Sequence, residues 1–169
     1  MNAAQDSAST APLPDDAPEP MTTAQRGVWV FLVTNISAAI AYAIVVVPRA
    51  LSQPIEDVSW VTPMLWAIGF QIVGTIVGSI LAAIGSAVSL AARGREPEVE
   101  MVTDARDKDI ERYGSRMTQG VLGAGTFVAL VLAMLDADTF WIGNTIFFFG
   151  VVSGIVEAVV KIRAYRRGL

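Results

Sequence analysis

The chain has 169 residues, of which 53% are hydrophobic, and its mean hydropathy is +0.53. This composition is too apolar for an ordinary soluble domain, and the length leaves no room for several domains. The net charge of −4 argues against nucleic-acid binding, because phosphate contacts need a basic surface. The sequence contains no cysteine and no histidine, which excludes disulfides, thiolate chemistry and metal sites built from these residues.

Residues 1–25 are rich in alanine, proline, serine, threonine and aspartate, and they contain no lysine or arginine. Such a segment has too little apolar surface to offset its chain entropy, so we expect a disordered N-terminal tail. It also lacks the positive stretch that begins a cleavable signal peptide, so we expect the first apolar run to stay in the mature protein. Residues 26–169 are then one transmembrane domain.

Four apolar runs are long enough to cross the roughly 30 Å hydrocarbon core of a bilayer. Pro48 should end the first run, and Pro63 suits the first turn of the second. The connection between the third and fourth runs is so short that these two helices must be antiparallel neighbours. We therefore predict an all-α integral membrane four-helix bundle made of two antiparallel transmembrane hairpins. The predicted spans are about 28–47, 63–92, 118–135 and 140–162.

Small residues at helical spacing form stripes along the predicted spans. Gly74 and Gly78 belong to such a stripe in the second span, and Gly150 and Gly154 repeat the same spacing in the fourth. This small-xxx-small pattern lets helix backbones approach closely in lipid. A pore lining would have a similar pattern. The stripe of the second span, however, has only one strongly hydrogen-bonding side chain, Gln71, which favours helix packing.

Two polar side chains inside the spans are candidates for function. For Asn35 in the first span, the sequence favours an interhelical hydrogen bond over a ligand contact. Glu157 is the only acid within a predicted span, so it is a functional-site hypothesis. Lys161 follows it by one helical turn, which favours a structural salt bridge. The alternatives are a role in proton or cation coupling and a contact with Arg116 or another base.

A dense charged block, residues 103–117, separates the second span from the third. We predict an amphipathic surface helix here that leads into the third span. The carboxylates of Asp104, Asp107 and Glu111 have a helical spacing that suits a divalent cation. Bases such as Arg106 are interleaved with these acids, which favours a self-neutralising charged surface over a metal site. We therefore predict no bound metal and regard this block as the candidate surface for a protein partner.

Lysine and arginine are concentrated in the middle loop and at the C-terminus, and only Arg26 and Arg49 lie elsewhere. The positive-inside rule then makes these segments cytoplasmic. We therefore expect a multi-pass protein of the bacterial cytoplasmic membrane with both termini on the cytoplasmic side. Because both lysines, Lys108 and Lys161, fall on the cytoplasmic side, an intramembrane serine–lysine pair has no candidate. We expect a protein that is not an enzyme and that binds no cofactor.

The charged block and the C-terminus resemble those of one protein family. The segment DARDKDIERYGSR at residues 104–116 and the terminal YRRG at 165–168 are similar to motifs of an uncharacterised family of small bacterial multi-pass membrane proteins. That family has a D-E-R-D-x-x-I-like motif before a pair of helices and a Y-R-R-G-like tail. Ala105 stands where the family has glutamate, whereas the other motif positions match at Asp104, Arg106, Asp107 and Ile110. The resemblance covers roughly residues 102–169 and implies a multi-pass membrane protein, with no catalytic or binding residue to carry over.

These features predict a membrane interaction or regulatory protein whose charged cytoplasmic helix and basic tail bind a protein partner. The alternative is a small transporter or channel subunit. A single four-helix bundle fills its own centre with side chains, so transport would require a homo-oligomer. In either case the lipid bilayer surrounds the spans.

Overall fold

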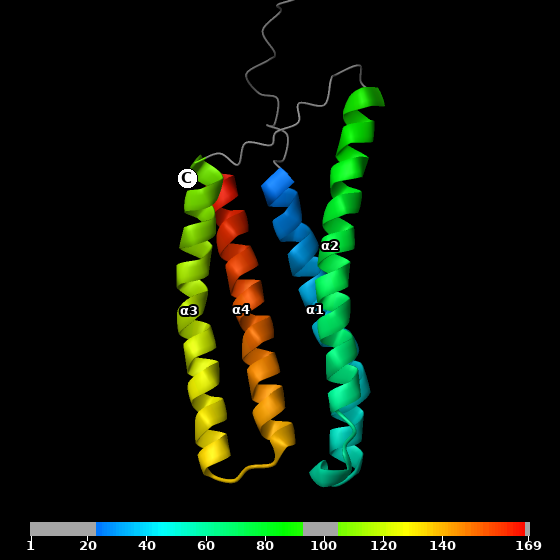
Figure 1. Ribbon diagram of the computed structural model, residues 1–169, viewed down its shortest axis with the longest axis vertical. Coiled ribbons are helices and arrows are strands. Elements are labelled where there is room, and N and C mark those ends of the chain that lie inside the picture. The colour runs from blue at the N-terminus through cyan, green and yellow to red at the C-terminus, as the bar shows by residue number, and fades with distance from the viewer. Residues whose placement is uncertain (1–22, 93–104, 168–169) are drawn as a thin grey trace, which may run out of the picture.

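The computed structural model describes residues 23–92 and 105–167, and this part of the chain is entirely helical and loop. Residues 1–22 of the predicted tail lie outside the described residues, whereas residues 23–25 already belong to the first helix. Four long helices stand roughly side by side (Figure 1). The elements are α1 (Thr23–Ser52), a short 3-10 helix η1 (Ile55–Asp57), α2 (Val61–Ala92), α3 (Ala105–Met134) and α4 (Thr139–Arg167).

Each long helix is long and apolar enough to cross a membrane, with candidate spans of 29, 28, 27 and 28 residues. A helix of this length is about 40 Å long, which exceeds the roughly 30 Å hydrocarbon core, so its ends reach the headgroup region. In α2 only 6% of the most apolar stretch is buried inside the chain. Its side chains therefore need an apolar environment outside the fold, and the four helices together indicate a multi-pass membrane protein.

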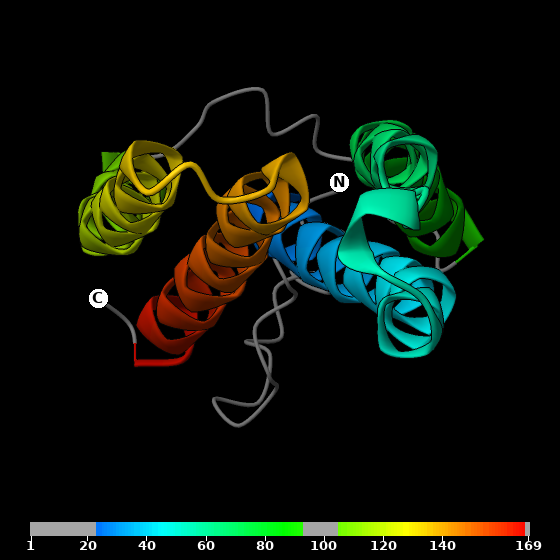
Figure 2. The same ribbon diagram turned by 90° about the horizontal axis from the view of Figure 1, so that it is seen from below.

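The helices form an open row in the order α3, α4, α1, α2. The extensive helix contacts join α3 to α4, α4 to α1, and α1 to α2. Figure 2 looks along the helices and shows α2 and α3 at opposite ends of this row. The arrangement differs from a closed four-helix bundle because α2 and α3 share no extensive contact in the described part of the chain. The two central helices, α1 and α4, therefore hold the fold together.

The first helix continues through Pro48, which we expected to end it. A proline lacks an N–H and clashes with the carbonyl four residues earlier, so it usually stops or kinks a helix. Here Pro48 lies about one turn before the helix ends at Ser52, so only the carbonyl of Ile44 loses its helical donor. The amide of Gln53 still donates to the Arg49 carbonyl at 3.1 Å and closes the last turn.

From Ala105 onward, the charged block and the third apolar run form one uninterrupted helix, α3. We expected an amphipathic surface helix at 103–117 that leads into the third span at 118–135, and residues 103 and 104 lie outside the described residues. The helix continues because the sequence has no proline between these parts and because the same face is buried in both. Ile110, Gly114 and Thr118, each one turn apart, are all buried. The charged first turns of α3 are thus a straight extension of its membrane segment.

A tight turn fixes α3 and α4 as neighbours. The amide of Ala137 donates to the Leu132 carbonyl at 3.0 Å, which is a Schellman bond at the end of α3. Asp136 adopts the left-handed conformation that this motif needs, with φ of 51°. Asp138 then caps α4, because its Oδ1 accepts a hydrogen bond from the amide of Phe140 at 2.7 Å.

Candidate functional site

A chain of hydrogen-bonded polar groups crosses the row of helices near the middle of α1. Asn35 is fully buried, with 0% of its surface exposed. Its Nδ2 donates to the carbonyl of Val151 in α4 at 3.0 Å, and its Oδ1 accepts from Nε2 of Gln71 in α2 at 2.9 Å. Asn35 thus hydrogen-bonds to both helices that flank α1. Both ends of its amide serve helix packing, which is the role that the sequence favoured over a ligand contact.

The close approach of α4 to Asn35 depends on Gly154. A Cβ at this position would lie 2.8 Å from Nδ2 of Asn35 and 3.1 Å from Cζ of Phe31. A larger residue would therefore push α4 away from α1 and lengthen the Asn35 hydrogen bond. Gly150, which we expected to act with Gly154, has no atom within 4 Å of a Cβ built on it. Gly150 is exposed, and a side chain at this position would meet open space among the described residues.

The glycines of α2 pack against α1. A Cβ on Gly78 would lie 2.6 Å from Cγ1 of Val30, and a Cβ on Gly74 would lie 3.2 Å from Cγ2 of Thr34. The hydroxyl of Thr34 also lies 2.9 Å from the hydroxyl of Thr75 in α2. This part of the small-residue stripe therefore brings two helices together and does not line an aqueous path.

A second hydrogen bond between α1 and α4 involves a residue that the sequence analysis did not single out. The hydroxyl of Tyr42 donates to Oδ1 of Asn144 at 2.6 Å, and Nδ2 of Asn144 donates to the Phe140 carbonyl at 2.8 Å. The rings of Tyr42 and Phe147 lie 4.8 Å apart beside this bond. The scarcity of amide side chains within the apolar runs is the signal that would have pointed to Asn144.

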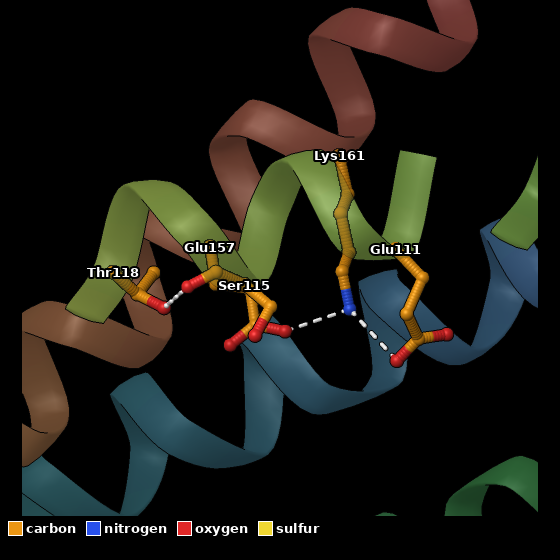
Figure 3. Close-up of polar contacts among 5 residues, drawn as sticks. All are labelled: Glu111, Ser115, Thr118, Glu157 and Lys161. Atoms are coloured by element: carbon orange, nitrogen blue, oxygen red, sulfur yellow. Dashed lines mark hydrogen bonds and ion pairs between the residues drawn. The ribbon is translucent and has the colours of Figure 1, made fainter. Parts of the chain in front are cut away.

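The second polar cluster joins α3 to α4 at the end where α4 finishes (Figure 3). Nζ of Lys161 lies 2.7 Å from Oε1 of Glu157 on the same helix, so the favoured salt bridge is present. The same Nζ lies 3.4 Å from Oε1 of Glu111 on α3. Among the described residues, no ion pair joins Glu157 to Arg116, which was an alternative partner. The contact with Glu111 ties the charged block directly to the last helix.

Lys161 reaches this position through a gap that Gly114 provides. A Cβ on Gly114 would lie 2.9 Å from Cε of Lys161, so the lysine stem crosses the α3 backbone at this glycine. The exposed fraction of the side chain is 12% for Lys161, 29% for Glu157 and 74% for Glu111. The apolar stem is thus covered while the ammonium group stays between two carboxylates. Pairing of this kind is what makes a poorly solvated charge tolerable.

This ion cluster forms one wall of an open pocket of about 330 Å³. The first turns of α1 form the opposite wall, which includes Val28 and Phe31. One side of the pocket is therefore charged and the other apolar. Glu157 and Glu111 both face Lys161, so the lysine already neutralises part of the charge on the acidic wall.

Only part of the predicted carboxylate trio falls within the described structure. Asp104 lies outside the described residues, and so do the side chains of Arg106 and Asp107. Glu111, the third member, contacts Lys161. Among the residues that the structure describes, no group of three acidic side chains is arranged to hold a metal ion.

The resemblance of residues 102–169 to a bacterial membrane protein family stays a prediction. Of the four matching positions in the D-E-R-D-x-x-I-like motif, Ile110 is the one whose side chain the structure describes, and it is buried. Comparison of the chain with protein-family models, with curated proteins and with solved structures gives no significant match.

Proposed function

We propose that this is a multi-pass protein of the bacterial cytoplasmic membrane that acts as a non-enzymatic interaction or regulatory protein and binds a protein partner on its cytoplasmic side. The distribution of charge supports this orientation. The first turns of α3 and the last turns of α4 lie at the same end of the four upright helices (Figure 1). The sequence concentrates lysine and arginine at that end. The acids Glu56, Asp57, Asp136 and Asp138 belong to the two opposite turns.

The observation that carries the proposal is that the charged first turns of α3, here called the α3 extension, contact α4. About 20 residues of α3 suffice to cross the hydrocarbon core, so roughly its first 10 residues, about 15 Å of helix, extend beyond it. The stem of Lys161 packs against this extension at Gly114, and its Nζ contacts Glu111 there. A surface that is ordered before binding loses less conformational entropy when a partner docks. A binding surface on the α3 extension would therefore be preformed.

The outer face of this extension carries charges of both signs. Lys108, Asp109, Arg112 and Arg116 are exposed. Arg112 lies 3.7 Å from Asp109, but exposed pairs of this kind contribute little to stability. These groups are free to reorganise toward complementary charges on another protein. Mixed charge favours a protein partner over nucleic acid, which would select for basic residues alone.

Charge reversal tests this proposal. The double variant K108E/R112E should lose a partner that copurifies with the full-length protein after crosslinking in membranes. The matched control is E56K/D57K, which reverses two charges at the other end of the molecule and should keep the partner. If the partner is retained equally by both variants, the α3 extension is not the binding surface.

A second candidate function is that of a transporter or channel subunit acting as a homo-oligomer. One observation favours it, because Glu157 is a partly buried acid that lines the open 330 Å³ pocket. The open row of helices would then require other copies to complete a path. The variant Glu157→Gln in proteoliposomes tests this function, since proton and cation flux equal to that of the wild type would exclude coupling through Glu157.

A further inference from the structure

An apolar pocket opens between α1 and α2 at the end opposite the charged extension of α3. Its volume is about 580 Å³, within the range of pockets that bury small ligands. Its inner wall comes from short side chains of α1, including Ala38, Ala41 and Val45, and from Phe70 of α2, while Trp66 lines the pocket one turn nearer the start of α2. The small residues on α1 leave the space, and the aromatic residues on α2 bound it. Tyr42 also lines the pocket from α1, but its hydroxyl already donates to Asn144, so this wall does not require a polar ligand.

Arg49 lies at the mouth of this pocket and is its only charged lining residue. It is exposed, and its guanidinium donates one hydrogen bond, from Nη1 to the Ser59 carbonyl at 3.2 Å. Glu56 and Asp57 are close in sequence, yet Arg49 forms no ion pair with any described acid. The remaining guanidinium N–H groups can therefore bind a bidentate oxyanion, which is the geometry that arginine recognises best.

Two further features make this mouth favourable for an anion. Thr62 and Pro63 from the first turn of α2 line the same pocket, and that turn contains no acidic residue. The positive end of the α2 dipole thus adds to the charge of Arg49. Trp66, which is largely exposed beside the pocket, belongs to a residue type that settles at the membrane interface. The mouth is therefore expected at headgroup depth and the inner wall at acyl-chain depth.

We propose that this pocket binds an anionic phospholipid, with its phosphate at Arg49 and one acyl chain along the wall formed by Ala38, Ala41 and Val45. The charge of the mouth selects the headgroup, and the apolar wall accepts a chain of any saturated or unsaturated type. A zwitterionic phospholipid supplies the same chain but places a cationic group beside Arg49, so it binds less well. This site is separate from the proposed partner surface. The pocket lies at one end of the helices, and the first turns of α3 lie at the other.

The test uses the full-length protein in detergent and measures lipid retention by native mass spectrometry. Phosphatidylglycerol and phosphatidylcholine with identical chains are the probes. We expect the wild type to prefer phosphatidylglycerol, and Arg49→Gln to lower that preference roughly tenfold, as for loss of one charge-assisted contact. Arg49→Lys should keep most of it. Lys108→Gln removes a cation at the other end of the molecule and should keep all of it.

The pocket is tested with a matched pair of alanines on α1. Ala41 lines this pocket and Ala43 lines a different groove, and both are exposed, so neither substitution crowds a buried core. Ala41→Phe should lower retention of both lipids, whereas Ala43→Phe should leave it unchanged. The proposal is overturned if Arg49→Gln keeps the wild-type preference, or if Ala41→Phe retains lipid as well as the wild type does. It is equally overturned if a free fatty acid binds at Arg49 and phosphatidylglycerol does not.

Discussion

Replacing Asn35 with alanine should weaken the fold at the point where three helices meet. The substitution removes the hydrogen bond from Gln71 and the hydrogen bond to the Val151 carbonyl. Interhelical hydrogen bonds in membrane proteins average about 0.6 kcal/mol each, so the two bonds together contribute about 1 kcal/mol. The partly buried amide of Gln71 also loses its partner, which adds about 1 kcal/mol. We expect a total loss of about 2 kcal/mol in the free energy of unfolding.

The free energy of unfolding can be measured by titrating the purified protein from mixed micelles into a denaturing detergent and following helix content. Thr126→Ala is the matched control. The hydroxyl of Thr126 donates only to the Leu122 carbonyl within its own helix, and the residue is exposed. Its loss should change the free energy of unfolding by less than about 0.5 kcal/mol.

A double-mutant cycle isolates the contact between α1 and α2. If Asn35→Ala and Gln71→Ala act through their shared hydrogen bond, the double variant should be less destabilised than the sum of the single variants, by roughly 0.6–1.7 kcal/mol. Additive effects would show that the two side chains do not interact. An effect of Asn35→Ala no larger than that of Thr126→Ala would refute the role of Asn35 as the bridge between helices.

Three further outcomes follow from the helix contacts and the charge distribution. Gly154→Leu should lower the free energy of unfolding by about 1–3 kcal/mol because its side chain meets α1, whereas Gly150→Leu, with open space around it, should change it little in the same titration. Lys161→Met keeps an apolar stem but removes both ion pairs. Amide hydrogen exchange should therefore become faster in the first turns of α3 and stay unchanged in the turn between α3 and α4. If the substitution changes the exchange rate equally at both ends of α3, Lys161 does not attach the first turns of α3 to α4. With a single cysteine introduced by Ser115→Cys or Asp138→Cys, an impermeant thiol reagent applied to intact cells should label only the cysteine at 138, and labelling only at 115 would invert the proposed topology.

The four spans could be predicted from the sequence because an apolar run of sufficient length has few alternatives to a membrane helix. Helix ends were harder to predict. Pro48 stays inside α1 because the penalty of a proline shrinks near a helix end, and local sequence does not say how many turns follow. The charged block and the apolar run share α3 because the buried face of the block continues that of the apolar run, although local sequence does not say whether a helix bends where its composition changes.

The contacts between helices could be predicted only in part. Gly150 and Gly154 have the same sequence signature, yet only Gly154 lies against α1, because the outcome depends on the side chain that the other helix presents. The pair between Glu157 and Lys161 lies within one helical turn and could be predicted from spacing. The contact between Lys161 and Glu111 joins residues 50 positions apart, and no local pattern marks it.

The placement of Asn35 has a consequence for how the protein is made. During synthesis α1 leaves the ribosome first, and the partner for Oδ1 of Asn35 follows with α2. The partner for Nδ2, the Val151 carbonyl, is 116 residues downstream of Asn35, so half of the amide lacks its native acceptor until the last helix is inserted. Lipid offers no substitute acceptor in the hydrocarbon core. The arrival of α4 therefore completes the hydrogen bonding of the first helix as well as its own packing.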